Sequence, residues 1–246
     1  MGTSRRTLAA DSVRERIKAY IVEHQLLPGA LMPTELVLCE ELGVSRSSLR
    51  EAIRQLDALD IVDVQHGRGT FVGNISLAPL VNSVTFRCTI DPRGPAKVLR
   101  EIVDVRRALD AGQAQAVVST MQGSHDEQLH ALADAMTAKA EADEDFTTED
   151  RAFHTLLMGK ATGNTLAQNL IGAFWDIHTV MVKQGNVHRH EDIIDTAKAH
   201  TAMLEAAEAG DLAGYLAAVD AHYRPLSQVI ERLDGPTQSA ESTPRG

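Results

Sequence analysis

Four side chains in the second half of the chain have the types and the spacing of a metal site. Asp150 and His154 are four residues apart, so on a helix they project from the same face. His200 and His222 lie in two later stretches with amphipathic helical patterns. If three helices bring these residues together, they form a site with one oxygen and three nitrogen ligands, which suits Zn²⁺, Ni²⁺ or Mn²⁺. The alternative is ordinary histidines on helix faces, since the chain has ten of them.

A second group of polar side chains, around residue 45, has the types needed to bind DNA. Ser45–Ser48 stand where a helix is expected to begin, and the free N–H groups of a helix N-terminus attract phosphate. Arg46 and Arg50 share one exposed helix face, and arginine is the side chain that most often reads guanine in the major groove. The turn His66–Gly69 contains two glycines, which let its backbone approach the adjacent minor groove. Serines and arginines of this kind also serve as a cap and a solvated face, but their order between a turn and a hairpin favours DNA binding.

The elements that position this group are predicted within the first 73 residues as three helices and a β-hairpin. The first helix is capped by Asp11 or Ser12, the second runs from Thr34 to Gly43, and Ser45 caps the third. The apolar residues expected on one side of the third helix are Leu49, Ala52, Ile53, Leu56 and Leu59. Residues 61–64 and 70–72 alternate as two short strands around the glycine turn. Together these elements predict a winged helix-turn-helix.

From about residue 76 onward, strand patterns disappear and helical patterns follow one another. A long helix is expected after Pro92 and Pro95, and further helices over 124–142, 147–161, 164–184, 190–209 and 211–233. The fold class is therefore mainly α, with a winged helix-turn-helix in residues 1–75 and a bundle of six or seven helices in residues 76–234. Residues 235–246 are rich in Gly, Pro, Ser and Thr and are expected to be disordered.

The charge and composition are compatible with a DNA-binding protein that has a separate acidic domain. The net charge is −10, but residues 1–73 hold nine Lys/Arg and ten Asp/Glu, whereas the remainder holds 15 and 24. No apolar run is long enough to cross a membrane, and Met1–Ala10 lacks the apolar core of a signal peptide. Cys39 and Cys88 have no motif spacing, which indicates reduced thiols in a cytoplasmic protein.

The DNA-reading region carries a specific pattern between Leu27 and Val72. Its parts are Leu27-Pro28-Gly29, Met32-Pro33-Thr34-Glu35, Leu42-Gly43-Val44-Ser45-Arg46, Leu49-Arg50-Glu51-Ala52, Leu56 and Gly67-Arg68-Gly69-Thr70-Phe71-Val72. In this pattern the chain resembles the GntR family of bacterial regulators. The resemblance implies DNA contacts from the third helix and the wing, namely from Ser45, Arg46, Ser47, Ser48, Arg50, His66 and Gly67.

Two positions depart from the family's pattern. Leu36 stands where the family commonly has arginine, which removes one contact to a base or a phosphate, so the operator sequence cannot be taken over from relatives. Asp60 stands where a glycine usually closes the recognition helix.

The helical part also carries a family pattern. It consists of Asp150-Arg151-Ala152-Phe153-His154, Gly163-Asn164, His200, Gly210-Asp211 and His222. These residues resemble the all-helical effector domain of the FadR subgroup, often named FCD, and imply that Asp150, His154, His200 and His222 bind a divalent metal ion. The resemblance extends over Val105–Leu109, where Arg106 would face the cavity and pair with an effector carboxylate. In a purely structural interpretation, the neighbouring surface residue Arg107 would serve equally well.

Other polar or aromatic residues remain open at this stage. His188 and His190 either approach the cavity or lie in solvent. Trp175 either packs in the core or a dimer interface or covers a ligand, and nothing in the sequence decides whether His178 lines the cavity.

These observations predict a transcription regulator rather than an enzyme. We expect a homodimer that binds a short pseudo-palindromic operator in double-stranded DNA, and whose helical domain binds a metal ion and a small carboxylate effector. One alternative is a metal-dependent hydrolase or lyase with a DNA-binding appendage, although no general base stands out beside the metal ligands. Another is a regulator that binds acyl-CoA without metal, against which the intact Asp and three His argue.

Overall fold

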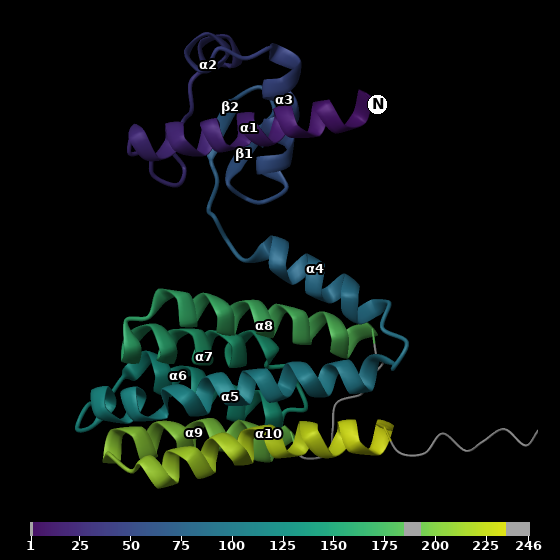
Figure 1. Cartoon of the computed structure of the whole chain (residues 1–246). Coiled ribbons are helices and arrows are strands. Elements are labelled where there is room, and N and C mark those ends of the chain that lie inside the picture. Colours follow the sequence, from purple (N-terminus) through teal and green to yellow (C-terminus); the bar gives the residue numbers. More distant parts are fainter. Residues whose placement is uncertain (1, 185–192, 235–246) are drawn as a thin grey trace, which may run out of the picture. The chain divides into compact units, whose positions relative to one another are not determined.

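In a computed structural model of the chain, the described residues, 2–184 and 193–234, form ten helices and one two-stranded sheet (Figure 1). They divide into two compact units, residues 1–80 and 81–246. The predicted class, mainly α with an N-terminal winged helix-turn-helix, is confirmed. The loop histidines His188 and His190 and the tail 235–246 lie outside the described residues.

The N-terminal unit contains the three helices and the hairpin expected from the sequence. They are α1 (Gly2–Glu23), α2 (Glu35–Leu42), α3 (Arg46–Asp57), β1 (Val62–Gln65) and β2 (Gly69–Val72). The prediction for the start of α1 is wrong, because the helix already begins at Gly2 and not at Asp11 or Ser12. No proline interrupts the first twelve residues, and Leu8, Ala9 and Ala10 favour helix, so nothing stops the helix at Asp11.

The turn between α2 and α3 follows from local chemistry. Gly43 ends α2 in the left-handed conformation at φ +56°, and its N–H bonds back to the last turn of that helix. Ser45 then caps α3, where its Oγ accepts the backbone N–H of Ser48 at 3.2 Å. Leu49, Ala52, Ile53 and Leu56 are buried as expected, but Leu59 lies beyond the helix and is 46% exposed.

The hairpin is anchored by a tight corner between Asp60 and Gly73. Asp60 adopts φ +56°, which explains why glycine is usual at this position of the family pattern. Its carboxylate accepts the N–H of Ser76 at 2.9 Å, and hydrogen bonds from Ser76 hold the pKa of Asp60 below its usual value. Gly73 passes so close to the Asp60 carbonyl that a Cβ at this position would collide with it. The Gly73 N–H donates to the Ile61 carbonyl at 2.9 Å, so this corner closes the open end of the antiparallel hairpin, where Val62 lies opposite Val72.

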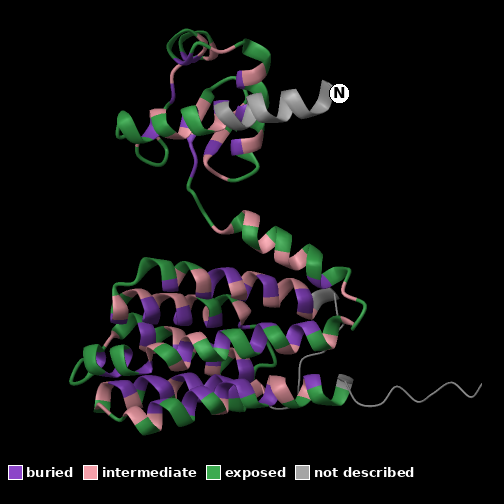
Figure 2. Ribbon diagram, viewed as in Figure 1, coloured by how far each residue is buried: buried purple, intermediate pink, exposed green. Residues whose placement is uncertain are grey.

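The second unit is a bundle of seven helices in its described part, as the sequence predicts. They are α4 (Ala78–Thr89), α5 (Pro95–Met121), α6 (Glu127–Glu141), α7 (Thr147–Thr162), α8 (Thr165–Gln184), α9 (Ile193–Ala209) and α10 (Leu212–Asp234). The long helix α5 packs against α7, α8, α9 and α10, and buried residues gather on the inward faces of these helices (Figure 2). Helix α4 joins the core of this unit through Val81, Val84 and Cys88.

None of the helices in the described stretches is both long enough and apolar enough to cross a membrane.

Candidate functional site

The four residues with metal-site spacing lie together in the interior of the helical unit. Helix α7 supplies Asp150 and His154, which share one face, α9 supplies His200, and α10 supplies His222. All four are buried, and one potential ligand atom from each lies within 4.8 Å of the other three. The packing of α7, α9 and α10 against α5 therefore brings together residues that are up to 72 positions apart in the sequence.

The nitrogens of the three imidazoles converge on the Asp150 carboxylate. His200 Nε2 lies 2.9 Å from Asp150 Oδ1, and His154 Nε2 lies 3.3 Å from the same oxygen. Centroids of neighbouring rings are 4.5 Å apart for His200 and His222 and 4.8 Å for His154 and His222. Three buried ring nitrogens have no hydrogen-bond partner: His154 Nε2, His200 Nδ1 and His222 Nδ1. Because buried polar atoms normally find partners, these nitrogens indicate a site shaped for something else that binds them.

The protonation of Asp150 and of His222 also suits a cation. Burial alone would raise the pKa of Asp150, but the charge of His200 and the close contacts that His200 and His154 make with the carboxylate outweigh it and hold the pKa well below its usual value. Burial lowers the pKa of His222 far below its usual value, and the field of His200 adds to this. A carboxylate and neutral imidazoles are the forms that bind divalent ions. With three nitrogens and one oxygen, the donor set fits Zn²⁺, Ni²⁺ or Mn²⁺.

Arg106 lies in the same interior, beside two aromatic residues, Trp175 and Tyr223, whose rings neighbour the histidine cluster. It is only 2% exposed, and its guanidinium stacks 3.7 Å from the centre of the Trp175 ring and 5.3 Å from that of Tyr223. Its Nη1 donates to Nδ1 of His178 at 2.8 Å. Burial and the neighbouring Arg106 charge lower the pKa of His178 to about 3, which keeps this imidazole neutral. Arg107, by contrast, is exposed and pairs with Asp220 at 2.8 Å, so only Arg106 can act in the interior.

Two residues whose roles the sequence leaves open, Trp175 and His178, lie beside Arg106 in the interior. Trp175 is 3% exposed and lies 6.1 Å from the ring of His154, so it links Arg106 to the histidine cluster. His178 lies 5.3 Å from Trp175, on the same interior side. Arg106 Nε, Trp175 Nε1 and His178 Nε2 are all buried without a partner. Because Nδ1 of His178 accepts from Arg106, its Nε2 carries the proton, and the three orphaned groups are all hydrogen-bond donors.

Sequence reasoning missed Asp110, a buried carboxylate beside His154. It is 3% exposed, lies one helical turn after Arg106, and is bonded by Tyr223 and His154. A signal was present in the sequence, because Arg106 and Asp110 interrupt a stripe of core positions on α5. The other members of this stripe are Leu99, Val103, Ala114 and Val117.

Two other features of the helical unit are less suited to a buried anionic ligand. His125, His130 and Glu208 form a second group of ligand-type atoms at the surface. The rings of the two histidines stack, His130 Nε2 bonds to Glu208 at 3.1 Å, and Glu208 also accepts the N–H of Asp126, so these side chains already have partners within the protein.

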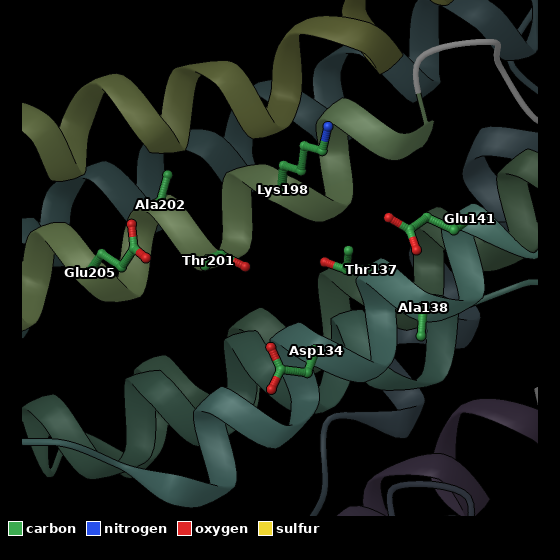
Figure 3. Close-up of a pocket in the computed structure, with 8 residues that line it drawn as sticks. All are labelled: Asp134, Thr137, Ala138, Glu141, Lys198, Thr201, Ala202 and Glu205. Atoms are coloured by element: carbon green, nitrogen blue, oxygen red, sulfur yellow. The ribbon is translucent and has the colours of Figure 1, made fainter.

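A groove of about 560 Å³ lies between α6 and α9 (Figure 3). It is lined by Asp134 and Glu141 from α6 and by Glu205 from α9, with one cation, Lys198, also from α9, and it includes none of the four clustered residues. Its surplus of carboxylates disfavours an acidic ligand.

The DNA-reading candidates lie at the N-terminus of α3 and on the wing. Ser45, Arg46 and Ser47 are exposed, Ser48 is half-buried, and the wing residues His66 and Gly67 are exposed. The structure adds a partner for Arg50, whose Nε donates to both oxygens of Glu35, at 2.8 and 3.1 Å. Glu35, the first residue of α2, therefore holds Arg50. Arg46, at the N-terminus of α3, extends into solvent.

The pH dependence of the metal-free protein offers a test of the histidine cluster. Burial lowers the pKa of His154, but Asp110 and Asp150 outweigh it and raise the pKa to about 9. This stabilisation, on the order of 3 kcal/mol, is complete below about pH 6.5 and is lost as the pH rises towards 9. His178 and His222 act in the opposite direction, because below about pH 6.5 only the unfolded state protonates them. We therefore expect thermal stability after chelation to peak near pH 6.5.

Thermal unfolding of the chelated protein between pH 5 and 9 measures this profile. The variant His154→Gln should lose the decline on the alkaline side. An equally steep alkaline decline in that variant would show that other groups cause it.

The two units define a class of protein: a winged helix-turn-helix joined to an all-helical domain with a buried polar centre. Residues 9–72 match the family described as bacterial regulatory proteins, gntR family, and residues 101–225 match the FCD domain. The chain therefore belongs to the GntR family, carries an FCD domain, and is a transcription regulator. This confirms the resemblance that the sequence motifs indicated.

Two bacterial regulatory proteins are similar in sequence to this chain over much of its length. An Escherichia coli K12 protein named as a regulator of the L-lactate dehydrogenase operon is 26% identical over 233 residues, which cover 92% of this chain and 87% of the relative. The fatty acid metabolism regulator protein of Shewanella halifaxensis is 28% identical over 163 residues, 65% of this chain and 64% of the relative. Among solved structures, Streptococcus agalactiae GntR has a TM-score of 0.66 at 23% identity and covers 89% of this chain and 99% of its own, which supports the fold.

Proposed function

We propose that this protein is a metal-containing, carboxylate-responsive repressor or activator that binds operator DNA as a homodimer. The observation that carries the proposal is the buried cluster of Asp150, His154, His200 and His222, with its unpartnered nitrogens, beside the buried Arg106. A divalent ion at the four residues would add a Lewis-acidic centre with positions left open for a ligand. Asp150 supplies the negative charge, and the three imidazoles supply nitrogen donors from three helices.

The effector is proposed to be a small carboxylate that lies between the cluster and Arg106. A guanidinium matches a carboxylate in geometry, and the orphaned donors of Trp175 and His178 favour a ligand rich in acceptor oxygens. The named relatives agree with this choice, since their names refer to L-lactate dehydrogenase and to fatty acid metabolism. An enzymatic role is not favoured, because Asp110, the additional buried carboxylate at the cluster, is already bonded by Tyr223 and His154.

The response to the effector is proposed to reach the DNA through the linker that precedes α4. In a dimer, two copies of α3 would face successive major grooves of a pseudo-palindrome, with Ser45, Arg46, Ser47, Ser48 and Arg50 at the DNA and His66 and Gly67 on the wing. The effector changes DNA affinity only to the extent that it binds the two states of the dimer differently.

Thermal unfolding of the full-length protein against a panel of small carboxylates tests the proposal. At 100 times its dissociation constant, the true effector should stabilise the protein by about 2.7 kcal/mol, and chelation beforehand should abolish the shift. Arg106→Gln should lose the shift, whereas the matched variant Arg107→Gln, which alters an exposed ion pair, should keep it. If no acid shifts the wild-type protein and chelation has no effect either, the histidine cluster is structural.

A further inference from the structure

Asp110 is the one buried carboxylate near the cluster, among the described residues, that is not a member of the four-residue donor set. A single oxygen, Oδ2, receives both of its contacts: the hydroxyl of Tyr223 donates to it at 2.6 Å, and His154 Nδ1 lies 3.2 Å away. The side chains of Asp110 and His154 are 5% and 1% exposed, so water does not compete for these contacts. Burying a carboxylate costs free energy unless its partners offset the loss of hydration.

The contact with Asp110 determines how the imidazole of His154 is presented. In the neutral imidazole, the form that binds a metal ion, an Nδ1 proton donated to a carboxylate leaves Nε2 with a free lone pair. This Nε2 is the nitrogen that faces Asp150 at 3.3 Å and has no hydrogen-bond partner. The two ring nitrogens point in diverging directions, so Asp110 lies behind the ring and not among the donors. Carboxylates placed in this way behind a ligating histidine fix its orientation and raise its basicity.

Tyr223 connects this support to the rest of the interior. It follows His222 on α10, its hydroxyl holds Asp110, and its ring lies 5.3 Å from the guanidinium of Arg106. Asp110 lies four residues after Arg106 on α5, so both project from one face of that helix. A shift of α10 against α5 would therefore disturb His222, Tyr223 and the support of His154 together.

We propose that Asp110 is a positioning residue of the metal centre, which orients His154 through Nδ1 and is itself held by the Tyr223 hydroxyl. This inference rests on the proposed metal centre and adds two residues that the sequence pattern of Asp150, His154, His200 and His222 does not contain. The exposed pair Arg107–Asp220 also joins α5 to α10, so it provides a matched control that is remote from the interior.

The experiment uses the full-length protein after chelation, with Ni²⁺ alone as the probe in competition with a chromophoric chelator. Asp110→Ala should weaken Ni²⁺ binding by about 10- to 100-fold, and Asp220→Ala should leave it unchanged. Asp110→Glu, which restores a carboxylate, should recover part of the loss. The visible absorption of bound Co²⁺ should shift in Asp110→Ala and not in Asp220→Ala, a change that a purely structural role would not cause.

Tyr223→Phe removes one hydroxyl and keeps the ring, so it provides the test even if Asp110→Ala does not fold. It should weaken Ni²⁺ binding in the same direction, by less than Asp110→Ala. If wild-type protein binds Ni²⁺ while Tyr223→Phe, or a folded Asp110→Ala, binds it equally well, the positioning role is overturned and the metal centre stands. If wild-type protein binds no Ni²⁺, the metal centre itself is overturned, and the role of Asp110 with it.

Discussion

Replacing His200 with glutamine is expected to abolish tight binding of Ni²⁺ or Zn²⁺ by the helical unit. His200 is fully buried, its Nε2 lies 2.9 Å from Asp150, and glutamine fills the space without an imidazole nitrogen. Residues that only support a ligating histidine are worth about 10- to 100-fold in metal affinity, so loss of a proposed ligand should exceed about 100-fold. The metal-dependent rise in stability, about 2.7 kcal/mol at 100 times the wild-type dissociation constant, should disappear with it. Titration calorimetry and thermal unfolding measure the two effects.

The matched control for this experiment is His130→Gln. His130 also bonds a carboxylate within the helical unit, that of Glu208, but it belongs to the surface group and not to the buried cluster. It should therefore keep the affinity and the stoichiometry of the wild-type protein. If His130→Gln loses the metal and His200→Gln retains it, the ion binds at the surface group and the proposed centre is wrong.

The parts of the protein that the sequence predicts are those determined by neighbours along the chain. The turn between α2 and α3 needs only Gly43 and Ser45, each of which acts on residues within four positions. In the same way, the pair Asp150 and His154 shares a face because α7 is a helix. The family pattern then adds His200 and His222, whose approach depends on how helices pack and is not visible in local spacing.

The features that sequence reasoning missed depend on contacts over long distances in the chain. Tyr223 bonds Asp110 across 113 positions, and Arg106 bonds His178 across 72. A charged residue within an apolar stripe signals that such a partner exists, but it does not say which residue of which helix supplies it. The start of α1 was predicted wrongly for a different reason. Asp11 caps a helix only if the residues before it are not themselves helical, and here they are.

Removing the guanidinium of Arg46 is expected to have the largest effect on DNA binding. Arg46 is the first residue of α3, is exposed, and stands where the free N–H groups of the helix attract phosphate. Arg50 lies on the same face, but Glu35 holds and partly neutralises it. A well-placed arginine contact contributes about 1–3 kcal/mol, and a dimer loses it in both half-sites, so Arg46→Ala should weaken operator binding at least about 30-fold.

The operator for this test can be selected from random duplex DNA with the wild-type protein. Gel-shift titrations on the selected duplex then compare Arg46→Ala and the double variant Arg46→Ala/Arg50→Ala with Arg54→Ala. Arg54 is another exposed arginine, in the last turn of the same helix and paired with Glu51, so its replacement changes the charge of α3 without changing the N-terminus of the helix. Only the first two variants should lose affinity for the selected duplex, because a contact that reads the base sequence depends on its position on the helix and not on net charge. Equal losses in all three variants would instead mean that α3 attracts DNA through its charge alone, and unchanged binding by the double variant would place the reading surface elsewhere.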